Sequence, residues 1–357
     1  MFDILRLVCS ALNIIKSSKP ENIYTMKAAI LEQVGQPVTV KEIQNPEPEK
    51  GEVRVRIKAA ALNHRDVWIQ KGRYPGNKEN IIAGSDGCGV IDEVGESVDR
   101  KHIGKEVIIN PSLNWGKDGR AQSSEFKILG NPDPGTLAER IVVPFENIHP
   151  KPQHLAATEA AALPLAGLTA YRALFTRAAI NAGENVLING VGGGVALLGM
   201  QMAISWGAKV YVSSSSENKQ KRAIEMGAEK AYDYQKENWG KEAAEETGGF
   251  DVILDGAAGP GFSELVDAVK PGGRIAIYGR TAGPFPELQP AKIFYKQASI
   301  LGTTMGSPDE FVAMTNVVSD KKIKPVVDKE FPLEKTEEAF RHMDEGKQFG
   351  KIVIRMD

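Results

Sequence analysis

Cysteine is scarce in this chain of 357 residues, in which Cys9 and Cys88 are the only thiols. Two cysteines exclude a disulfide framework and a zinc site built from four thiolates. The five histidines are scattered, and none belongs to an H-x-x-x-H or H-x-x-E-H pattern that binds metal from one helix. A zinc site would therefore need ligands from distant segments, and the low thiol content is typical of a reducing cytoplasm.

The chain also lacks an excess of charge of one sign, because 44 lysines and arginines stand against 46 aspartates and glutamates. The net charge of −2 gives no reason to expect nucleic acid or an anionic membrane as a partner. A small-molecule substrate is the better expectation.

The apolar run near the N-terminus is too short to cross a membrane. RLVCSALNII, residues 6–15, falls well below the roughly 20 residues that a bilayer requires. Asp3 precedes it and no small-residue cleavage site follows, so it does not match a secretory signal peptide. We interpret residues 1–25 as an N-terminal extension, either a short helix or a segment ahead of a true start at Met26.

With 42% hydrophobic residues, the chain is long enough for two domains. Residues 26–152 contain short strand-like runs separated by glycine and proline clusters, which predicts a mostly antiparallel β unit. In residues 153–301 helices alternate with strands that are nearly all apolar, which predicts a parallel sheet with right-handed crossovers. Two strand-like runs within residues 302–357 would return to the first unit.

A long polar stretch at residues 114–139 has little periodicity and predicts a lobe or lid. Loops of this length in compact domains usually have a function. We expect NWGKDGRAQ, residues 114–122, and GRTAGPFPEL, residues 279–288, to form the walls of a substrate pocket.

A glycine-rich turn, NGVGGGVA, follows a predicted strand and precedes a helix. Its best match to G-x-G-x-x-G is Gly190-x-x-Gly193-x-x-Ala196, which ends in alanine. Glycine lets a pyrophosphate approach the first helical turn, where unpaired N–H groups and the helix dipole favour an anion. The context predicts dinucleotide binding here, with Gly194 and Val195 also in contact. The alternative is a turn that serves only the close packing of helix and strand.

The next strand ends in VYVSSSSENKQKR, residues 210–222, without the acidic residue that would hold the ribose 2′-hydroxyl of NAD. Hydroxyl and cationic side chains stand there instead: Ser213, Ser214, Ser216, Lys219, Lys221 and Arg222. This combination suits a 2′-phosphate, so the sequence predicts NADPH. The alternative is a solvated helix face with ordinary surface lysines.

Five motifs occur in order along residues 26–357: ALNHRDVWIQKG, GSDGCGVIDEVG, LPLAGLTAYRAL, NGVGGGVA and GKIVI. With them the chain resembles the medium-chain dehydrogenase/reductase superfamily, and most of all its zinc-independent quinone oxidoreductase branch. The resemblance implies an α/β fold with a Rossmann doubly wound parallel sheet, residues 153–301. This sheet would be inserted into a GroES-like, mostly antiparallel β catalytic domain, residues 26–152 and 302–357. It also implies NADPH-dependent reduction of quinones or other activated alkenes, and a homodimer.

The same resemblance bears on metal binding. Zinc-dependent alcohol dehydrogenases of the superfamily have a ligand Cys at the position of Asn63 and a ligand His at that of Ser85. Their third ligand, a Cys, falls near Ala166 and Gly167. Their lobe with four structural cysteines corresponds to residues 110–137, which contain none. The resemblance therefore implies a site without catalytic zinc.

Asn63 and Asp66 are the candidate catalytic residues, because the resemblance implies that this segment lines the nicotinamide pocket. The Asn63 amide could hold a carbonyl or hydroxyl without any proton transfer. Asp66 is either catalytic, a helix cap or a partner for Arg65. The resemblance implies further cofactor contacts at Thr169, Lys219, Tyr234, Gly279 and Lys351.

Three functions are compatible with these residues. The first is hydride transfer from NADPH to a quinone or enone, with protein hydrogen bonds stabilising the developing oxyanion. The second is an alcohol dehydrogenase that binds zinc through His64, Asp66 and Asp86. The third is a protein that binds NADPH without turnover, as a reservoir or sensor. In the first case we expect little or no ethanol oxidation, because a simple alcohol needs a stronger electrophile.

Overall fold

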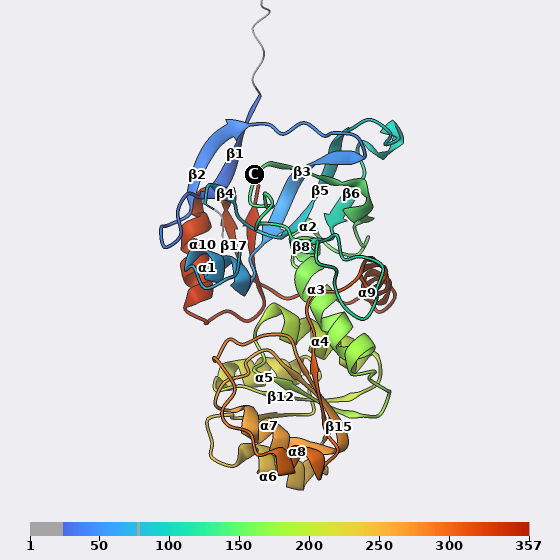
Figure 1. Ribbon diagram of the computed structural model, residues 1–357, viewed down its shortest axis with the longest axis vertical. Coiled ribbons are helices and arrows are strands. Elements are labelled where there is room, and N and C mark those ends of the chain that lie inside the picture. The colour runs from blue at the N-terminus through green and yellow to red at the C-terminus, as the bar shows by residue number, and fades with distance from the viewer. Residues whose placement is uncertain (1–23, 77–78, 357) are drawn as a thin grey trace, which may run out of the picture.

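The computed structural model describes residues 24–76 and 79–356. Most of the predicted extension, residues 1–25, lies outside the described residues. The described chain forms two parts stacked along its long axis (Figure 1). The first and last segments, blue to green and red, build one part, and the yellow to orange segments build the other. Helices α3 (Pro164–Tyr171) and α4 (Gly194–Ser205) lie where the two parts meet.

The first part is built mostly from antiparallel strand pairs. Among the described residues, a seven-stranded sheet has the order β10-β6-β5-β3-β18-β17, with β9 paired to β3. Within this sheet β17 and β18 are parallel, and the other pairs are antiparallel. A second sheet has the order β2-β1-β4, and β7 pairs with β8. The last two strands therefore return to the N-terminal unit, as predicted.

The strands of this part are β1 (Thr25–Leu31), β2 (Thr39–Gln44), β3 (Glu52–Ala61), β4 (Ile81–Ile82), β5 (Asp86–Val94), β6 (Glu106–Ile109), β7 (Ser112–Leu113), β8 (Lys127–Ile128), β9 (Arg140–Pro144), β10 (Ile148–Pro150), β17 (Val327–Pro332) and β18 (Lys351–Arg355). Its helices are α1 (His64–Gln70), α2 (Ala157–Ala161), α9 (Pro308–Asp320) and α10 (Thr336–Asp344). Short helical turns occupy Arg100–His102, Phe145–Asn147 and Leu333–Lys335.

The second part is a parallel sheet of six strands among the described residues, with the order β13-β12-β11-β14-β15-β16. Its strands are β11 (Asn185–Asn189), β12 (Lys209–Ser213), β13 (Lys230–Tyr232), β14 (Phe250–Asp255), β15 (Val269–Ile277) and β16 (Ser299–Gly302). Besides α4, its helices are α5 (Glu217–Glu225), α6 (Trp239–Thr247), α7 (Phe262–Ala268) and α8 (Pro290–Phe294). Helices in the described residues lack the length and apolar character needed to cross a bilayer.

Alternating side chains of the parallel strands pack on opposite faces of the sheet. Val186 and Ile188 belong to the apolar cluster that contains Leu197 of α4. Leu187, between them in β11, packs in the cluster of α6 and α7, with Phe262. The strands are therefore buried on both faces, which is why their sequences are almost wholly apolar.

The strand order reverses at β11, whose neighbours are β12 on one side and β14 on the other. In doubly wound sheets the crevice outside the carboxyl ends of such strands is where ligands bind. The predicted doubly wound sheet is confirmed, and its topology places a ligand crevice next to the glycine-rich turn.

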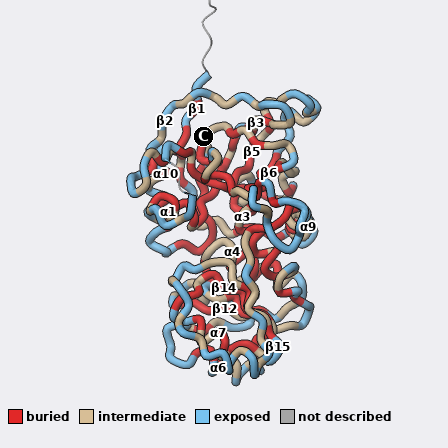
Figure 2. The backbone as a smooth tube through the Cα atoms, in the orientation of Figure 1, coloured by how far each residue is buried: buried red, intermediate tan, exposed pale blue. Residues whose placement is uncertain are grey.

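One apolar cluster spans both parts. It joins Ala61 and Val353 of the antiparallel sheet, Leu168 of α3 and Val186 of the parallel sheet. Figure 2 shows buried segments in red in both parts. Apolar packing through α3 therefore holds the two sheets in a fixed relation, which makes the crevice between them a defined site.

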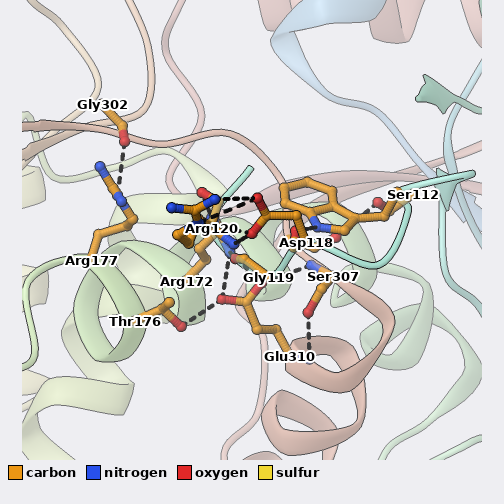
Figure 3. Close-up of polar contacts among 12 residues, drawn as sticks. Ser112, Asp118, Gly119, Arg120, Arg172, Thr176, Arg177, Gly302, Ser307 and Glu310 are labelled. Carbon is orange, nitrogen blue, oxygen red and sulfur yellow. Dashed lines mark hydrogen bonds and ion pairs between the residues drawn. The ribbon is translucent and has the colours of Figure 1, made fainter. Parts of the chain in front are cut away.

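The predicted lobe is fastened by a buried arginine. Arg172 begins a π-helical turn, Arg172–Arg177, and its Nη1 lies 2.7 and 2.8 Å from the Glu310 carboxylate oxygens on α9. The same guanidinium donates to the carbonyls of Gly119 and Arg120 in the lobe, as Figure 3 shows, and it stacks over the Trp115 ring. The lobe is thus held by one cation with several partners.

Candidate active site

A cleft of about 700 Å³ opens between the two parts, at the carboxyl ends of β11, β12, β14 and β15. Helices α1 and α3 and the first residue of β18 line its other side. The cleft is lined by these predicted site residues: Asn63, Thr169, Gly190, Gly193, Gly194, Val195, Ser214, Lys219, Tyr234, Gly279 and Lys351. Ser213 and Asp66 lie outside its lining.

The glycine-rich turn connects β11 to α4 and faces the cleft. Gly190 and Gly192 have φ angles of 72° and 145°, which L side chains rarely adopt. A Cβ added to Gly193, the N-cap of α4, would meet no atom within 4 Å, whereas one on Gly194 would lie 2.6 Å from Cδ of Lys351. Gly193 therefore leaves open space at a helix N-terminus, where a phosphate is favoured, and Gly194 makes room for the lysine.

A polar network supports the turn from behind. The Ser213 hydroxyl donates to Asn189 Oδ1 at 2.6 Å and accepts from the Gly190 N–H at 3.0 Å. Asn189 in turn donates to Asp255 Oδ1 at 2.8 Å. Ser213 is fully buried, so the structure does not support its predicted contact with the cofactor. As the last residue of β12, it points into the sheet and holds the turn instead.

Hydroxyl groups and one ammonium group line the cleft beyond β12. The hydroxyl groups of Ser215 and Tyr234 lie 2.9 Å apart, and Lys219 donates to the Gly346 carbonyl at 2.9 Å. The other two predicted cations are engaged elsewhere, because Lys221 pairs with Glu217 and Arg222 stacks on a phenylalanine ring. Burial lowers the pKa of Lys219.

Three buried polar side chains meet next to the glycine-rich turn, where α1 and β18 line the cleft. Lys351 Nζ lies 2.6 Å from Asn63 Oδ1 and 2.9 Å from Asp86 Oδ2. Asn63 Nδ2 lies 2.9 Å from the same Asp86 oxygen, and the other Asp86 oxygen accepts the Leu165 N–H at 2.8 Å. The lysine is therefore buried as an ion pair whose partners are all hydrogen-bonded.

Asp66 has a capping contact in the structure. Its carboxylate accepts the Asn63 N–H at 2.8 Å in the first turn of α1, and it is buried away from the cleft. Arg65 does not pair with it, since the guanidinium donates to Ser85 Oγ at 2.7 Å and to the Leu129 carbonyl at 2.8 Å. Of the predicted alternatives for Asp66, the structure supports the helix cap, and the cleft gives no support to a catalytic role.

Apolar and aromatic side chains surround the end of the cleft near Asn63. Trp68, Tyr74 and Met305 line it, together with His64. Burial lowers the pKa of His64, and the nearby positive charge of Lys351 lowers it further. The imidazole is therefore neutral near pH 7.

The prediction that residues 114–122 form a wall of the pocket is wrong. No side chain of that loop lines the cleft, whereas the other predicted loop contributes Gly279, Thr281 and Ala282. The reason is tertiary, because the Arg172 and Glu310 pair holds the lobe against α9.

Comparison with known proteins places the chain in a family. Family models match at residues 194–320, for a zinc-binding dehydrogenase, and at residues 49–153, for an alcohol dehydrogenase GroES-like domain. The zinc-type alcohol dehydrogenase-like protein YogA of Leptosphaeria maculans is 35% identical, over 91% of this chain and 96% of its own length. The chain belongs to the medium-chain dehydrogenase/reductase superfamily.

Two further relatives support this assignment. The quinone oxidoreductase of Mus musculus is 28% identical over 92% of this chain and 97% of its own length. A crystal structure of an NAD-dependent alcohol dehydrogenase is 38% identical, with a TM-score of 0.88 over 93% of this chain and all of the other. This dehydrogenase/reductase is an oxidoreductase of the quinone oxidoreductase-like type, with the predicted Rossmann and GroES-like architecture.

The zinc named in some of its relatives does not fit the donor set of this dehydrogenase/reductase. Asn63, Ser85 and Ala166 stand at the three ligand positions that the family resemblance implies. Among residues 24–76 and 79–356, no three His, Cys, Asp or Glu side chains group closely enough to hold a metal ion. The alternative set is not assembled either, since Asp66 caps α1 and Asp86 pairs with a lysine.

Asp66 is expected to make the stability of this dehydrogenase/reductase depend on pH. Burial raises the pKa of Asp66 from 3.8 to about 6, and one of its oxygens has no hydrogen-bond partner among the described residues. Since the folded protein holds this proton more tightly than the unfolded chain, the stabilisation is complete below about pH 4 and is lost as the pH rises to about 6.

Asp66→Asn is expected to remove this dependence, because the amide keeps an acceptor for the Asn63 N–H without any charge. The variant should match the wild type near pH 4 and exceed its free energy of unfolding by up to ~3 kcal/mol at pH 8. Urea denaturation at pH 4, 5, 6 and 8 measures the difference. Parallel pH profiles for the two proteins would contradict the raised pKa.

Sequence reasoning missed the pairing of Asp86 with Lys351 and the place of Ser215 in the cleft. Both charged residues stand at the start of largely apolar strands, where a charge needs a buried partner. That local signal shows that each charge has a partner, but 265 residues separate the two, so the sequence does not show which partner.

Proposed function

We propose that this dehydrogenase/reductase transfers hydride from NADPH to a quinone, an enone or another activated acceptor without zinc. The observation that carries this proposal is the cleft, which joins the glycine turn to the cluster of Asn63, Asp86 and Lys351. This cluster offers hydrogen bonds and a fixed charge, and the described residues offer no metal-ligand set. NADPH, when bound, would supply the hydride, and the chain would supply binding and orientation.

The preference for NADPH rests on the side chains that follow β12. Ser214, Ser215, Lys219 and Tyr234 line that end of the cleft, and no carboxylate of the described residues does. Hydroxyl groups and an ammonium group suit a 2′-phosphate, whereas NAD binding normally uses an acidic residue at this position. The backbone at Gly193 and the N-terminus of α4 would hold the pyrophosphate.

The acceptor class follows from the opposite end of the cleft. Trp68, Tyr74 and Met305 present aromatic and apolar surface, which suits a planar molecule. Polarisation of the acceptor oxygen would come from hydrogen-bond donors such as the Asn63 amide. Because a neutral donor stabilises less charge than a metal cation does, acceptors that are already electron-poor are favoured.

A panel assay that follows NADPH absorbance tests the proposal. Quinones, enones, enoyl thioesters and aldehydes are each offered with NADPH or NADH, before and after dialysis against a chelator. We expect NADPH oxidation with one class of electron-poor acceptor, unchanged by the chelator, and no NADPH formation from ethanol and NADP.

Three outcomes of the assay oppose the proposal. Retention of about one zinc per chain, with loss of activity on chelation, would favour a zinc-type alcohol dehydrogenase. Tight NADPH binding without turnover of any acceptor would favour a cofactor-binding or sensor protein. A preference for NADH would contradict the assigned phosphate subsite.

We also propose a homodimer formed through the parallel sheet. β16 is one of the two edge strands of that sheet in the described residues, and Phe294 and Tyr295 just before it are 60% and 80% exposed. Edge strands with nearby exposed aromatic groups favour pairing with another chain. Sedimentation velocity measures the mass directly, and a monomer at micromolar concentration would contradict the dimer.

A cytoplasmic location stays a prediction.

A further inference from the structure

A lysine, a carboxylate and an amide form a closed triangle at the wall of the cleft, beside the glycine-rich turn. Each pair among Lys351, Asp86 and Asn63 lies within hydrogen-bond distance, at 2.6 to 2.9 Å. The Lys351 and Asp86 side chains are 4% and 0% exposed. Sheet register brings them together, because Ala61 in β3 is opposite Asp86 on one side and Val353 on the other.

The chemistry of the triangle sets the orientation of the Asn63 amide. An ammonium group only donates hydrogen bonds and a carboxylate only accepts them. The amide oxygen must therefore face Lys351 and the amide nitrogen must face Asp86, which is the arrangement observed. Asp86 uses one of the two amide N–H groups, so the second remains for a molecule in the cleft.

We propose that Lys351 and Asp86 are positioning residues that orient and polarise the Asn63 amide as the donor to the acceptor oxygen. This inference rests on the proposed function. The positive charge next to the amide oxygen draws electron density from the amide and strengthens its remaining N–H as a donor. In a buried site this effect is larger than in water, because the surroundings screen the charge less.

Asp86 allows the lysine to be buried as one half of an ion pair. The carboxylate is held by Lys351 Nζ, Asn63 Nδ2 and the Leu165 N–H, so its charge is satisfied by three donors. The arrangement is pre-formed by the sheet and by α3. It therefore requires no reorganisation when negative charge develops on the acceptor oxygen, which is the condition for electrostatic catalysis.

The rival role for Lys351 is a direct contact with a cofactor phosphate, and kinetics separate the two. A phosphate contact predicts weaker NADPH binding when the ammonium is removed. A positioning role predicts unchanged NADPH binding and a lower kcat. The loss of kcat should be greater with the enone, whose oxygen depends more on polarisation, than with the quinone.

The test uses the full chain with Lys351→Met, Asn63→Ala and the double variant. The Kd for NADPH is measured by fluorescence, and kcat and KM are measured with an electron-poor quinone and with an enone. For Lys351→Met we expect kcat to fall about 100-fold with the enone and about tenfold with the quinone, with the NADPH Kd within about threefold of wild type. The double variant should lose no more than Asn63→Ala alone, because the lysine acts through the amide.

Two further variants keep the experiment decisive. Lys335→Met makes the same chemical change on an exposed lysine and should alter neither the NADPH Kd nor kcat. The combination of Asp86→Asn with Lys351→Met leaves no unpaired buried charge. It replaces Lys351→Met in the test if Lys351→Met alone does not fold. The combined variant should also lose more kcat with the enone than with the quinone.

Several results would overturn the inference. For Lys351→Met, these are an NADPH Kd that rises by the same factor as kcat/KM falls, equal losses of kcat with both acceptors, or an unchanged kcat. Additive losses of kcat in the double variant would also overturn it. If none of the tested acceptors supports NADPH oxidation by the wild type, the proposed function fails and this inference fails with it. Wild-type turnover combined with an unaffected variant overturns only the positioning role.

Discussion

Gly193→Val is expected to weaken NADPH binding by at least about 100-fold, or ~2.7 kcal/mol, while the NADPH-free protein keeps its stability to within about 1 kcal/mol. A Cβ at Gly193 would meet no atom of the chain within 4 Å, and the residue already has an extended backbone, with φ −81° and ψ 162°. A side chain therefore begins in open space here, and this space lies in front of the N-terminus of α4.

The expected loss is large because backbone N–H groups would bind the pyrophosphate of the proposed cofactor, and these groups act only at close approach. Fluorescence titration gives the Kd, and urea denaturation gives the free energy of unfolding. Gly119→Val is the matched control, since a Cβ there also meets nothing within 4 Å but lies outside the cleft. Equal Kd values for Gly193→Val and the wild type would show that the cofactor does not approach this turn.

Arg172→Met is expected to lower the free energy of unfolding by about 3–5 kcal/mol, the usual effect of removing one partner from a buried ion pair. Arg172 is 2% exposed and has four hydrogen bonds, two to the Glu310 carboxylate and two to lobe carbonyls. Methionine fills much of the volume but leaves the Glu310 charge and both carbonyls without this donor. Urea denaturation measures the loss, and added Glu310→Gln should restore part of it.

A surface pair provides the control for this prediction. Lys230 and Glu246 form an ion pair of similar length, at 2.5 Å, but their side chains are 46% and 49% exposed. Lys230→Met should therefore cost at most about 1 kcal/mol. Equal losses of unfolding free energy in Arg172→Met and Lys230→Met would contradict the expectation that burial makes the Arg172 pair more important for stability. In Arg172→Met, limited proteolysis should also cut the lobe near Gly119 first, because its anchor (Figure 3) is lost.

The parts of the site that could be predicted are those that depend on neighbouring residues. The turn at Gly190 and Gly193 was identified because backbone approach to a phosphate needs glycine at the end of a strand and the start of a helix. Ser214 and Lys219 were identified because they follow the next strand at a fixed distance from that turn. The predicted cofactor contact of Ser213 is not supported, because its hydroxyl at the end of β12 donates to Asn189, whereas Ser214 follows the strand and lines the cleft.

The parts that could not be predicted depend on contacts between distant residues. Asp66 gave a capping signal and a catalytic one, and only its contact with the Asn63 N–H distinguishes them. The loop at residues 114–122 has the composition of a pocket wall, yet Arg172 and Glu310 hold it away from the cleft.

The sequence by itself determined the parallel sheet, its antiparallel neighbour and the glycine-rich turn, because periodicity and residue type are local properties. Only the tertiary structure decided which charges meet. Asp86 and Lys351 become neighbours because their strands flank β3 in one sheet, and a buried ion pair forms only where both partners are brought out of water together.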